Sequence, residues 1–240
     1  MFHKKIGKML QIGICFPLIT NSCRELNNLH QNKERQNIYL ISFLTHLTEL
    51  DLQQNKISVI SKLKNLNKLF LSNNCIEDIS ALQSLTDLIY LDLSYNKLTS
   101  YTVALPSLVD LQLGYNKLQD KSGLQHSPKL QRFYLSETET SDLRSIPPQL
   151  FGLKQLELPQ NNIKEISYLS NFKDLQILDL NENKQLQNIG SLKFRTQLTE
   201  LTISETNVSD IWPLRFLKNL TRLEMNVNSI YEKFKNIRYV

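Results

Sequence analysis

The chain has 240 residues and a formal net charge of +5, with 41% hydrophobic and 21% charged residues. Only six glycines and seven prolines are present, which excludes a collagen-like or linker-like chain, and the supply of Leu and Ile excludes global disorder. No apolar run reaches the roughly 18 residues that a membrane-spanning helix needs, and the three cysteines and four histidines lack metal-ligand spacing, so we expect no transmembrane segment, metal or cofactor.

Residues 1–23 form an apolar leader that has two interpretations. A lysine-rich start precedes the apolar stretch 9–19, and small polar residues follow it, as in a secretory signal peptide. Gln11 and Pro17 interrupt that stretch, which favours a helical cap or a start assigned too early.

Residues 24–46 are predicted to be an N-terminal cap that contains half a repeat. Apolar residues recur there at three-residue intervals, at Ile38, Ile41 and Leu44, but the strand that should precede them is missing. Terminal units of repeat proteins are commonly atypical in this way.

From residue 47 to residue 240, one phrase, L-x-x-L-x-L-x-x-N-x-I/L, recurs nine times. Its polar position is spaced by 19 to 23 residues and is occupied by Asn55, Asn74, Asn96, Asn116, Thr138, Asn161, Asn183, Thr206 and Asn228. Such a period is the signature of a solenoid, in which each unit stacks on its neighbours.

The phrase has a direct physical interpretation. The x-L-x-L-x segment has a period of two, so its leucines point to one side of a short strand, and stacked copies bury them in a continuous core. The recurring Asn carries donors and an acceptor that can satisfy the backbone at the turn, which predicts an Asn ladder. Apolar residues then recur every third position, which suits short 3₁₀ or irregular segments on the convex side.

These repeats resemble leucine-rich repeat proteins of the 22-residue class, similar to the Sds22 regulator of protein phosphatase 1, and they also resemble the bacterial internalins. The resemblance covers about residues 36–240. It implies an α/β fold: a curved leucine-rich repeat solenoid with a concave parallel β-sheet. Sds22-like proteins close with a capping segment, and no clear C-terminal cap follows the ninth repeat, so a fragment of a larger repeat protein is a further interpretation.

The concave face of this solenoid is the candidate protein-binding surface. Four columns of side chains should face it: the residue before the second Leu of the phrase, the residue between the second and third Leu, and the two residues before the Asn position. These columns contain eleven acidic residues against three basic ones. Aromatic residues gather in its N-terminal half, where they can anchor a partner. The candidate partner-binding residues are Asp51, Phe70, Tyr90, Asp92, Tyr95, Tyr115, Tyr134, Glu157, Asp179, Glu182 and Glu224.

We therefore expect a non-enzymatic scaffold that binds a protein partner with a basic surface, because like charges held side by side attract the opposite charge. The resemblance to Sds22 implies a phosphatase catalytic subunit as that partner and a cytoplasmic or nuclear location. A secreted, internalin-like adhesion module is the alternative if residues 1–22 are a signal peptide. The blander interpretation is that the acids only keep a long sheet soluble.

Other chemistry finds little support in the sequence. No nucleophile elbow, phosphate-binding glycine loop or zinc-protease motif is present, so no catalytic residue is predicted. Nucleic acid needs a basic surface, and an acidic concave face disfavours it there.

Overall fold

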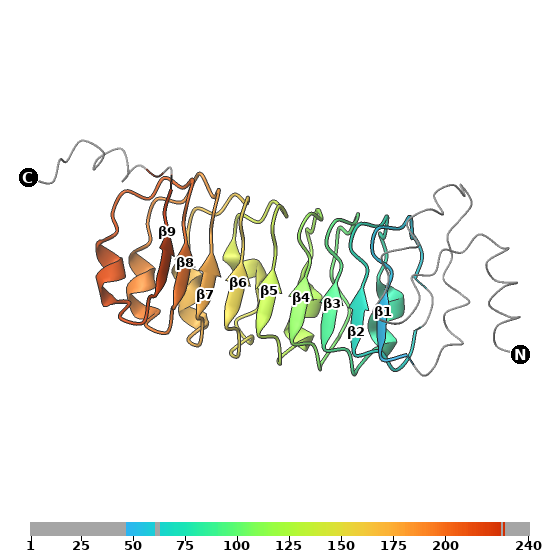
Figure 1. Cartoon of the computed structure of the whole chain (residues 1–240). Helices are drawn as coiled ribbons and strands as arrows, with labels where there is room; N and C mark the ends of the chain where they lie inside the picture. The colour runs from blue at the N-terminus through green and yellow to red at the C-terminus, as the bar shows by residue number, and fades with distance from the viewer. Residues whose placement is uncertain (1–46, 61–62, 227, 229–240) are drawn as a thin grey trace, which may run out of the picture.

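The computed structural model describes residues 47–60, 63–226 and 228, and within them nine short strands form one parallel sheet. The strands follow one another in chain order from β1 at one end to β9 at the other (Figure 1). They are β1 (Glu49–Asp51), β2 (Lys68–Phe70), β3 (Tyr90–Asp92), β4 (Asp110–Gln112), β5 (Arg132–Tyr134), β6 (Gln155–Glu157), β7 (Ile177–Asp179), β8 (Glu200–Thr202) and β9 (Arg222–Glu224).

Short 3₁₀ helices return the chain behind the sheet (Figure 1). Those of the described residues are η2 (Ser80–Ser84), η3 (Ser122–His126), η4 (Leu143–Ser145), η5 (Ser167–Asn171), η6 (Gly190–Phe194) and η7 (Trp212–Phe216). None exceeds five residues. The predicted fold class, a solenoid with a parallel sheet on one side and short 3₁₀ segments on the other, is confirmed.

The core lies between the sheet and the 3₁₀ side. The middle residue of most strands points inward, and Leu69, Leu111 and Leu178, for example, are fully buried. Apolar residues from the return segments, such as Leu82 and Leu169, meet them in one continuous cluster. A three-residue strand with one apolar face cannot bury itself, so each unit gains its core only from its neighbours.

The chain turns out of each of the strands β1 to β8 through a left-handed residue that directly precedes the recurring Asn or Thr. Tyr95 has a φ of 54°, Tyr115 of 58° and Glu182 of 57°. Bulky residues seldom adopt this region because the Cβ crowds the backbone. A backbone hydrogen bond to the next repeat holds each of these turns. The Tyr115 amide donates to the Ser136 carbonyl at 2.7 Å, and the Glu182 amide donates to the Ser204 carbonyl at 2.9 Å.

The recurring Asn residues form a hydrogen-bonded ladder along the edge of the sheet. The Asn183 Nδ2 donates to the Leu158 carbonyl of the preceding repeat and to the Leu180 carbonyl of its own, both at 2.9 Å. Its Oδ1 accepts from the Ile163 amide at 3.0 Å. Where Thr replaces Asn, the Thr206 hydroxyl donates to the Ile203 carbonyl at 2.8 Å and so keeps one of these bonds.

The same pattern of bonds recurs at Asn74, Asn96, Asn116 and Asn161. At the first described turn, the Asn55 Nδ2 donates to carbonyls of its own repeat, those of Leu52 and Gln53. At the last, the Asn228 Oδ1 accepts from the Thr206 amide at 3.0 Å. The Asn side chains at positions 74, 96, 116, 161 and 183 thus tie their repeats to the preceding ones, whereas the Thr138 and Thr206 hydroxyls donate to carbonyls of their own repeats.

The predicted leader at 1–23 and cap at 24–46 lie outside the described residues, as does most of the convex half of the ninth repeat. Among the residues that the structure does describe, no helix is long and apolar enough to cross a membrane.

Candidate protein-binding surface

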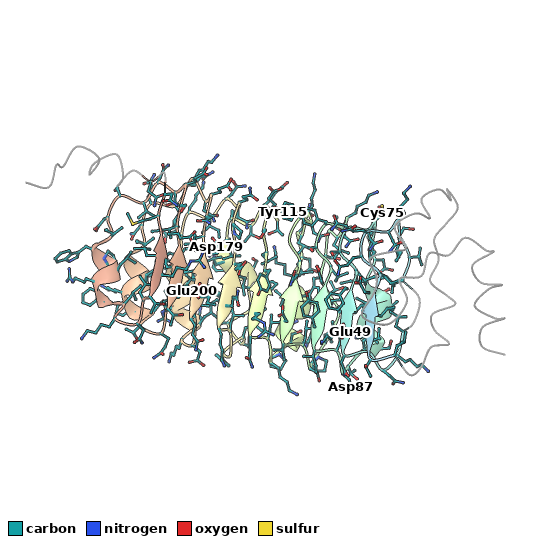
Figure 2. The ribbon with its side chains drawn as sticks, viewed as in Figure 1. Glu49, Cys75, Asp87, Tyr115, Asp179 and Glu200 are labelled. Atoms are coloured by element: carbon teal, nitrogen blue, oxygen red, sulfur yellow. The ribbon has the colours of Figure 1, made fainter. Side chains whose placement is uncertain are left out.

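The strand register fixes the two central columns of the concave face. Asp51 pairs with Phe70, which pairs with Asp92. Further along the same column, Tyr134 pairs with Glu157, which pairs with Asp179. Figure 2 shows Glu49, Asp179 and Glu200 over the strands, whereas Tyr115 and Cys75 lie at one edge and Asp87 at the opposite edge. The candidate residues of these columns therefore share one face.

Aromatic rings form two contacts in the N-terminal half of the face. Phe70 and Tyr90 lie with their ring centroids 4.7 Å apart and their planes tilted by 37°. Tyr95 and Tyr115 stack at 3.9 Å with an interplanar angle of 10°. Aromatic pairs of this kind hold one another in place, so they form a rigid apolar area that a partner can cover without much further ordering.

Two carboxylates of this half are buried. Asp92 and Asp110 each keep only 7% of their surface exposed. Asp92 accepts from the amide and hydroxyl of Ser94, and Asp110 accepts from the Arg132 Nε at 2.6 Å. Asp92 was predicted as a contact residue; in the structure it lies beneath its neighbours and offers a partner little surface.

Burial and nearby carboxylates raise the pKa values of two neighbouring tyrosines, Tyr90 and Tyr134. The pKa of Tyr90 is raised to about 12, mainly by burial and to a smaller extent by the nearby Asp92 and Asp110. The pKa of Tyr134 is also raised to about 12, mainly by burial and to a smaller extent by the nearby Asp110 and Glu157. The Gln112 amide donates to the Tyr90 hydroxyl at 2.9 Å and orients it. Both phenols are therefore neutral hydrogen-bonding groups at any physiological pH.

The C-terminal half of the face is acidic. Burial raises the pKa of Glu157, and the nearby Asp179 and Asp110 raise it further, while a hydrogen bond from Gln155 opposes them. Burial also raises the pKa of Asp179. The nearby Glu224 and Glu182 raise this pKa further, whereas a hydrogen bond from the Asn181 amide lowers it. The folded protein therefore holds these carboxylates together at a cost in stability.

The three concave bases are already paired. Lys68 lies 3.2 Å from Glu49, Arg132 lies 2.6 Å from Asp110, and Arg222 contacts Glu200 at 3.5 Å and Glu224 at 2.6 Å. Among the described residues, these pairs leave seven of the eleven concave acids without a basic partner: Asp51, Asp92, Glu137, Glu157, Asp179, Glu182 and Glu205. Glu157 and Asp179 lie side by side in paired strands.

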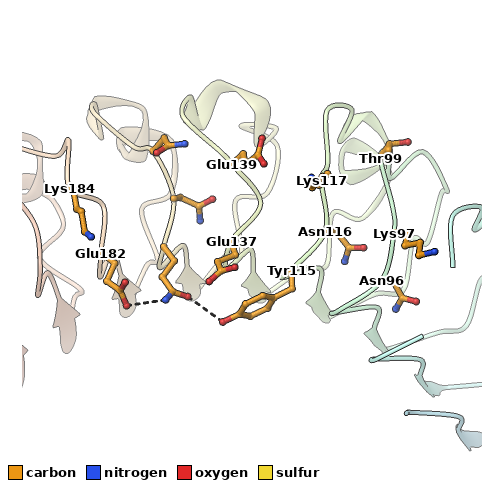
Figure 3. A pocket seen from close by; sticks show the side chains of 13 residues that line it. Asn96, Lys97, Thr99, Tyr115, Asn116, Lys117, Glu137, Glu139, Glu182 and Lys184 are labelled. Carbon is orange, nitrogen blue, oxygen red and sulfur yellow. Dashed lines mark hydrogen bonds between the residues drawn. The ribbon is translucent and has the colours of Figure 1, made fainter. Parts of the chain in front are cut away.

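An open cavity of about 690 Å³ lies at the ladder edge of the sheet, and Figure 3 shows it from close by. The Tyr115 hydroxyl donates to the Gln160 Oε1 at 3.2 Å, and the Gln160 Nε2 donates to Glu182 at 3.1 Å (Figure 3). The cavity is lined by Asn96, Lys97, Thr99, Tyr115, Asn116, Lys117, Glu137, Glu139, Gln160, Asn161, Asn162, Glu182 and Lys184.

The lysines of this edge cavity were not predicted as site residues. Lys97, Lys117 and Lys184 each follow a ladder Asn directly. The residues that directly follow the ladder Asn form a fifth column of side chains, and aligning this column in the sequence predicts that the three lysines lie along the same edge of the sheet.

The surface outside the four concave columns has the opposite charge. Within the described residues, it carries fifteen Lys and Arg residues against nine Asp and Glu residues. In the same part of the chain, no group of three or more His, Cys, Asp or Glu side chains is placed to hold a metal ion.

A family model described as leucine-rich repeats (two copies) matches residues 45–84 and 64–105. The leucine-rich repeat-containing protein 56 of Rattus norvegicus is 30% identical over 105 residues, which is 43% of this chain but only 19% of that protein. The chain thus spans about a fifth of the length of this curated relative.

Solved structures share the solenoid. The internalin InlF of Listeria monocytogenes is 27% identical with a TM-score of 0.65, over 77% of this chain and 62% of that one. Internalin C2 of the same species is 26% identical with a TM-score of 0.58, over 81% of this chain and 79% of that one. Human 5T4, at 22% identity and a TM-score of 0.64, shares the fold. The chain therefore carries leucine-rich repeats and folds as a leucine-rich repeat solenoid with internalin-like neighbours.

Proposed function

We propose that the concave face binds a protein partner with a basic surface and that the chain acts as a non-enzymatic scaffold. Leucine-rich repeat proteins generally mediate protein–protein interactions, and their fold is typically non-enzymatic. The observation that carries the proposal is the side-by-side placement of Glu157 and Asp179 with no basic partner among the described residues. A basic surface would relieve that repulsion and would be steered toward the face.

The pKa values argue against solubility as the whole explanation for these acids. Fully hydrated surface carboxylates keep ordinary pKa values, whereas burial and neighbouring carboxylates raise those of Glu157 and Asp179. Acids that only solubilise a sheet need not be half-buried beside one another.

The specific partner that we propose is a protein phosphatase 1-type catalytic subunit, located in the cytoplasm or nucleus. The support is the alternation of acid and aromatic residues along the central column, as Asp51, Phe70 and Asp92 and again as Tyr134, Glu157 and Asp179. It is similar to the surface that Sds22-like proteins present. Gln112 and Thr202 interrupt the alternation.

The test is titration calorimetry with the purified phosphatase catalytic subunit. The double variant Phe70→Ala and Glu157→Ala should weaken binding about tenfold or more, because it removes an aromatic anchor and an unpaired acid. The matched control is Phe151→Ala with Glu165→Ala, which removes the same residue types at exposed positions outside the concave columns. Equal affinity of the two double variants would end this assignment.

A second candidate is a secreted, internalin-like adhesion module. It is favoured by the likeness to two internalin structures, at 27% and 26% identity. On this proposal, the same face binds an extracellular protein, and the mature protein begins near residue 23. Intact mass of the protein from fractionated cells separates the candidates: a full-length mass in the cytosol opposes adhesion, and a processed mass outside the cell supports it. A much larger mass would show that the chain is part of a longer protein.

A further inference from the structure

The last two 3₁₀ helices differ from the earlier five-residue ones at two equivalent positions on the outer side of the solenoid, and η7 differs at a third. The first, fourth and fifth residues of the five-residue helices are Ser80, Gln83 and Ser84 in η2, Ser122, Gln125 and His126 in η3, Ser167, Ser170 and Asn171 in η5, Gly190, Lys193 and Phe194 in η6, and Trp212, Arg215 and Phe216 in η7. At the fourth and fifth positions the earlier five-residue helices carry Gln, Ser, Asn or His, where η6 and η7 carry a basic residue and a phenylalanine. At the first position η7 alone among these helices has an aromatic residue, Trp212. The repeat fold does not require this change, because η2, η3 and η5 form without it.

The aromatic residues at these positions are exposed. Trp212 keeps 67% of its surface exposed, Phe194 64% and Phe216 41%. The two helices pack against each other, so the three rings and their basic neighbours form one surface, which we call the convex patch: Lys193, Phe194, Trp212, Arg215 and Phe216. A cluster of exposed large apolar side chains with charged neighbours marks an interaction site more often than chance exposure does.

Cations lie against these rings. The Arg215 guanidinium lies 3.8 Å from the Trp212 ring centroid and 4.4 Å from that of Phe216. The Lys193 ammonium lies 4.8 Å from the Phe194 ring. No acidic residue belongs to η6 or η7; the nearby Asp210 accepts a hydrogen bond from the Trp212 amide at 2.8 Å, just before η7 begins.

We propose that the convex patch docks on an anionic phospholipid surface. Tryptophan and phenylalanine with adjacent Lys or Arg suit the boundary between headgroups and acyl chains, where rings insert and cations meet lipid phosphates. The patch lies on the outer side of the solenoid, from which side chains can reach a flat layer. The acidic concave face lies on the opposite side of the repeats, so repulsion from the same membrane turns it outward and leaves it open to a basic protein.

The experiment uses the intrinsic fluorescence of the full chain, because Trp212 is its single tryptophan. Unilamellar vesicles of phosphatidylcholine with 30% phosphatidylserine are titrated into the protein, and vesicles of phosphatidylcholine alone serve as the neutral comparison. We expect a blue shift and co-flotation with the anionic vesicles, and at least tenfold weaker binding to the neutral ones.

Two variants locate the contact. Arg215→Gln with Phe216→Ser gives η7 the residues that η2 carries at those positions, keeps the fluorescent Trp212, and should reduce binding to anionic vesicles about tenfold. Phe151→Ser removes an equally exposed ring elsewhere and should leave it unchanged. The wild-type titration decides the matter even if the double variant does not fold.

An unshifted Trp212 emission with anionic vesicles would overturn the proposal. So would a blue shift that appears with poly-glutamate or single-stranded DNA but not with vesicles, because it would assign the patch to a polyanionic macromolecule instead of a lipid surface.

Discussion

Glu157 and Asp179 lie directly beside each other in the paired strands β6 and β7, although both are carboxylates and neither has a basic partner among the described residues. Burial raises the pKa of both. A sequence selected for stability alone would place an opposite charge or a neutral side chain at one of these positions. The pair therefore lowers the stability of the free protein and leaves negative charge that a basic side chain of a partner protein can neutralise.

Asp179→Asn should raise the thermal stability at pH 7. Because the pKa of Asp179 is higher in the folded state than in the unfolded chain, the charged form opposes folding above that raised pKa. The penalty disappears as the pH falls below about 4, the ordinary range of an unfolded aspartate. After allowance for solvent screening, we expect a gain of about 1–2 °C at pH 7 that vanishes near pH 4.

Melting curves followed by circular dichroism at several pH values measure this gain. The exposed Asp87, which lies at an edge of the sheet and not over its strands, provides the control, since Asp87→Asn should not reproduce the effect (Figure 2). A loss of stability in Asp179→Asn at pH 7 would show that its carboxylate has a stabilising partner.

Binding of the basic partner should depend on salt. The affinity of the wild type should fall steadily between 50 and 500 mM NaCl, because the attraction arises from partly exposed carboxylates that ions screen. Glu157→Gln with Asp179→Asn should bind more weakly and show a shallower salt dependence. Calorimetric titration of the phosphatase subunit measures both; equal slopes for the two proteins would place the electrostatic contact elsewhere.

Asn183→Ala should destabilise the protein by about 1–3 kcal/mol, the cost of leaving buried backbone groups unpaired. The Asn183 side chain bonds carbonyls of two repeats and accepts an amide of the preceding one. Within the described residues, the Asn55 side chain bonds carbonyls of its own turn alone, so Asn55→Ala should cost clearly less in urea denaturation. Equal losses at the two positions would contradict a ladder that links the repeats.

Arg195→Ala should also be destabilising, by about 1–3 kcal/mol. Arg195 is buried, and its Nη1 donates to the Phe172 carbonyl at 3.0 Å and to the Leu169 carbonyl at 3.3 Å, so it ties η5 to the following repeat. Arg144 is paired with Asp142 at the surface, and Arg144→Ala should scarcely change the urea midpoint. If both variants behave alike, the Arg195 bonds contribute little.

The fold was predictable because a single period determines it. Once Leu69, Leu91 and Leu111 are aligned in the repeat phrase, the register of their strands follows, and the structure pairs them in that way. The same alignment predicts that Glu157 lies beside Asp179, and the structure pairs these two residues.

The burial and the hydrogen bonds of individual side chains were harder to predict from the sequence. The column pattern treats Asp92 as exposed, yet the surrounding side chains bury it, and burial depends on rotamers that a period does not specify. The Tyr115 hydroxyl reaches Gln160 two repeats away, which a reading of adjacent strands cannot reveal. The convex patch was missed because only the concave columns were compared position by position.

The most direct test of the central claim is site-specific photo-crosslinking in cells that express the protein naturally. A photoreactive residue at Thr202, in the central concave column, is compared with one at Gln125, on the exposed side of η3. We predict a discrete protein adduct from position 202 that is absent from position 125 and is lost with Phe70→Ala and Glu157→Ala. The same adduct from both positions, or an adduct at 202 that survives the double substitution, would contradict binding through the concave face.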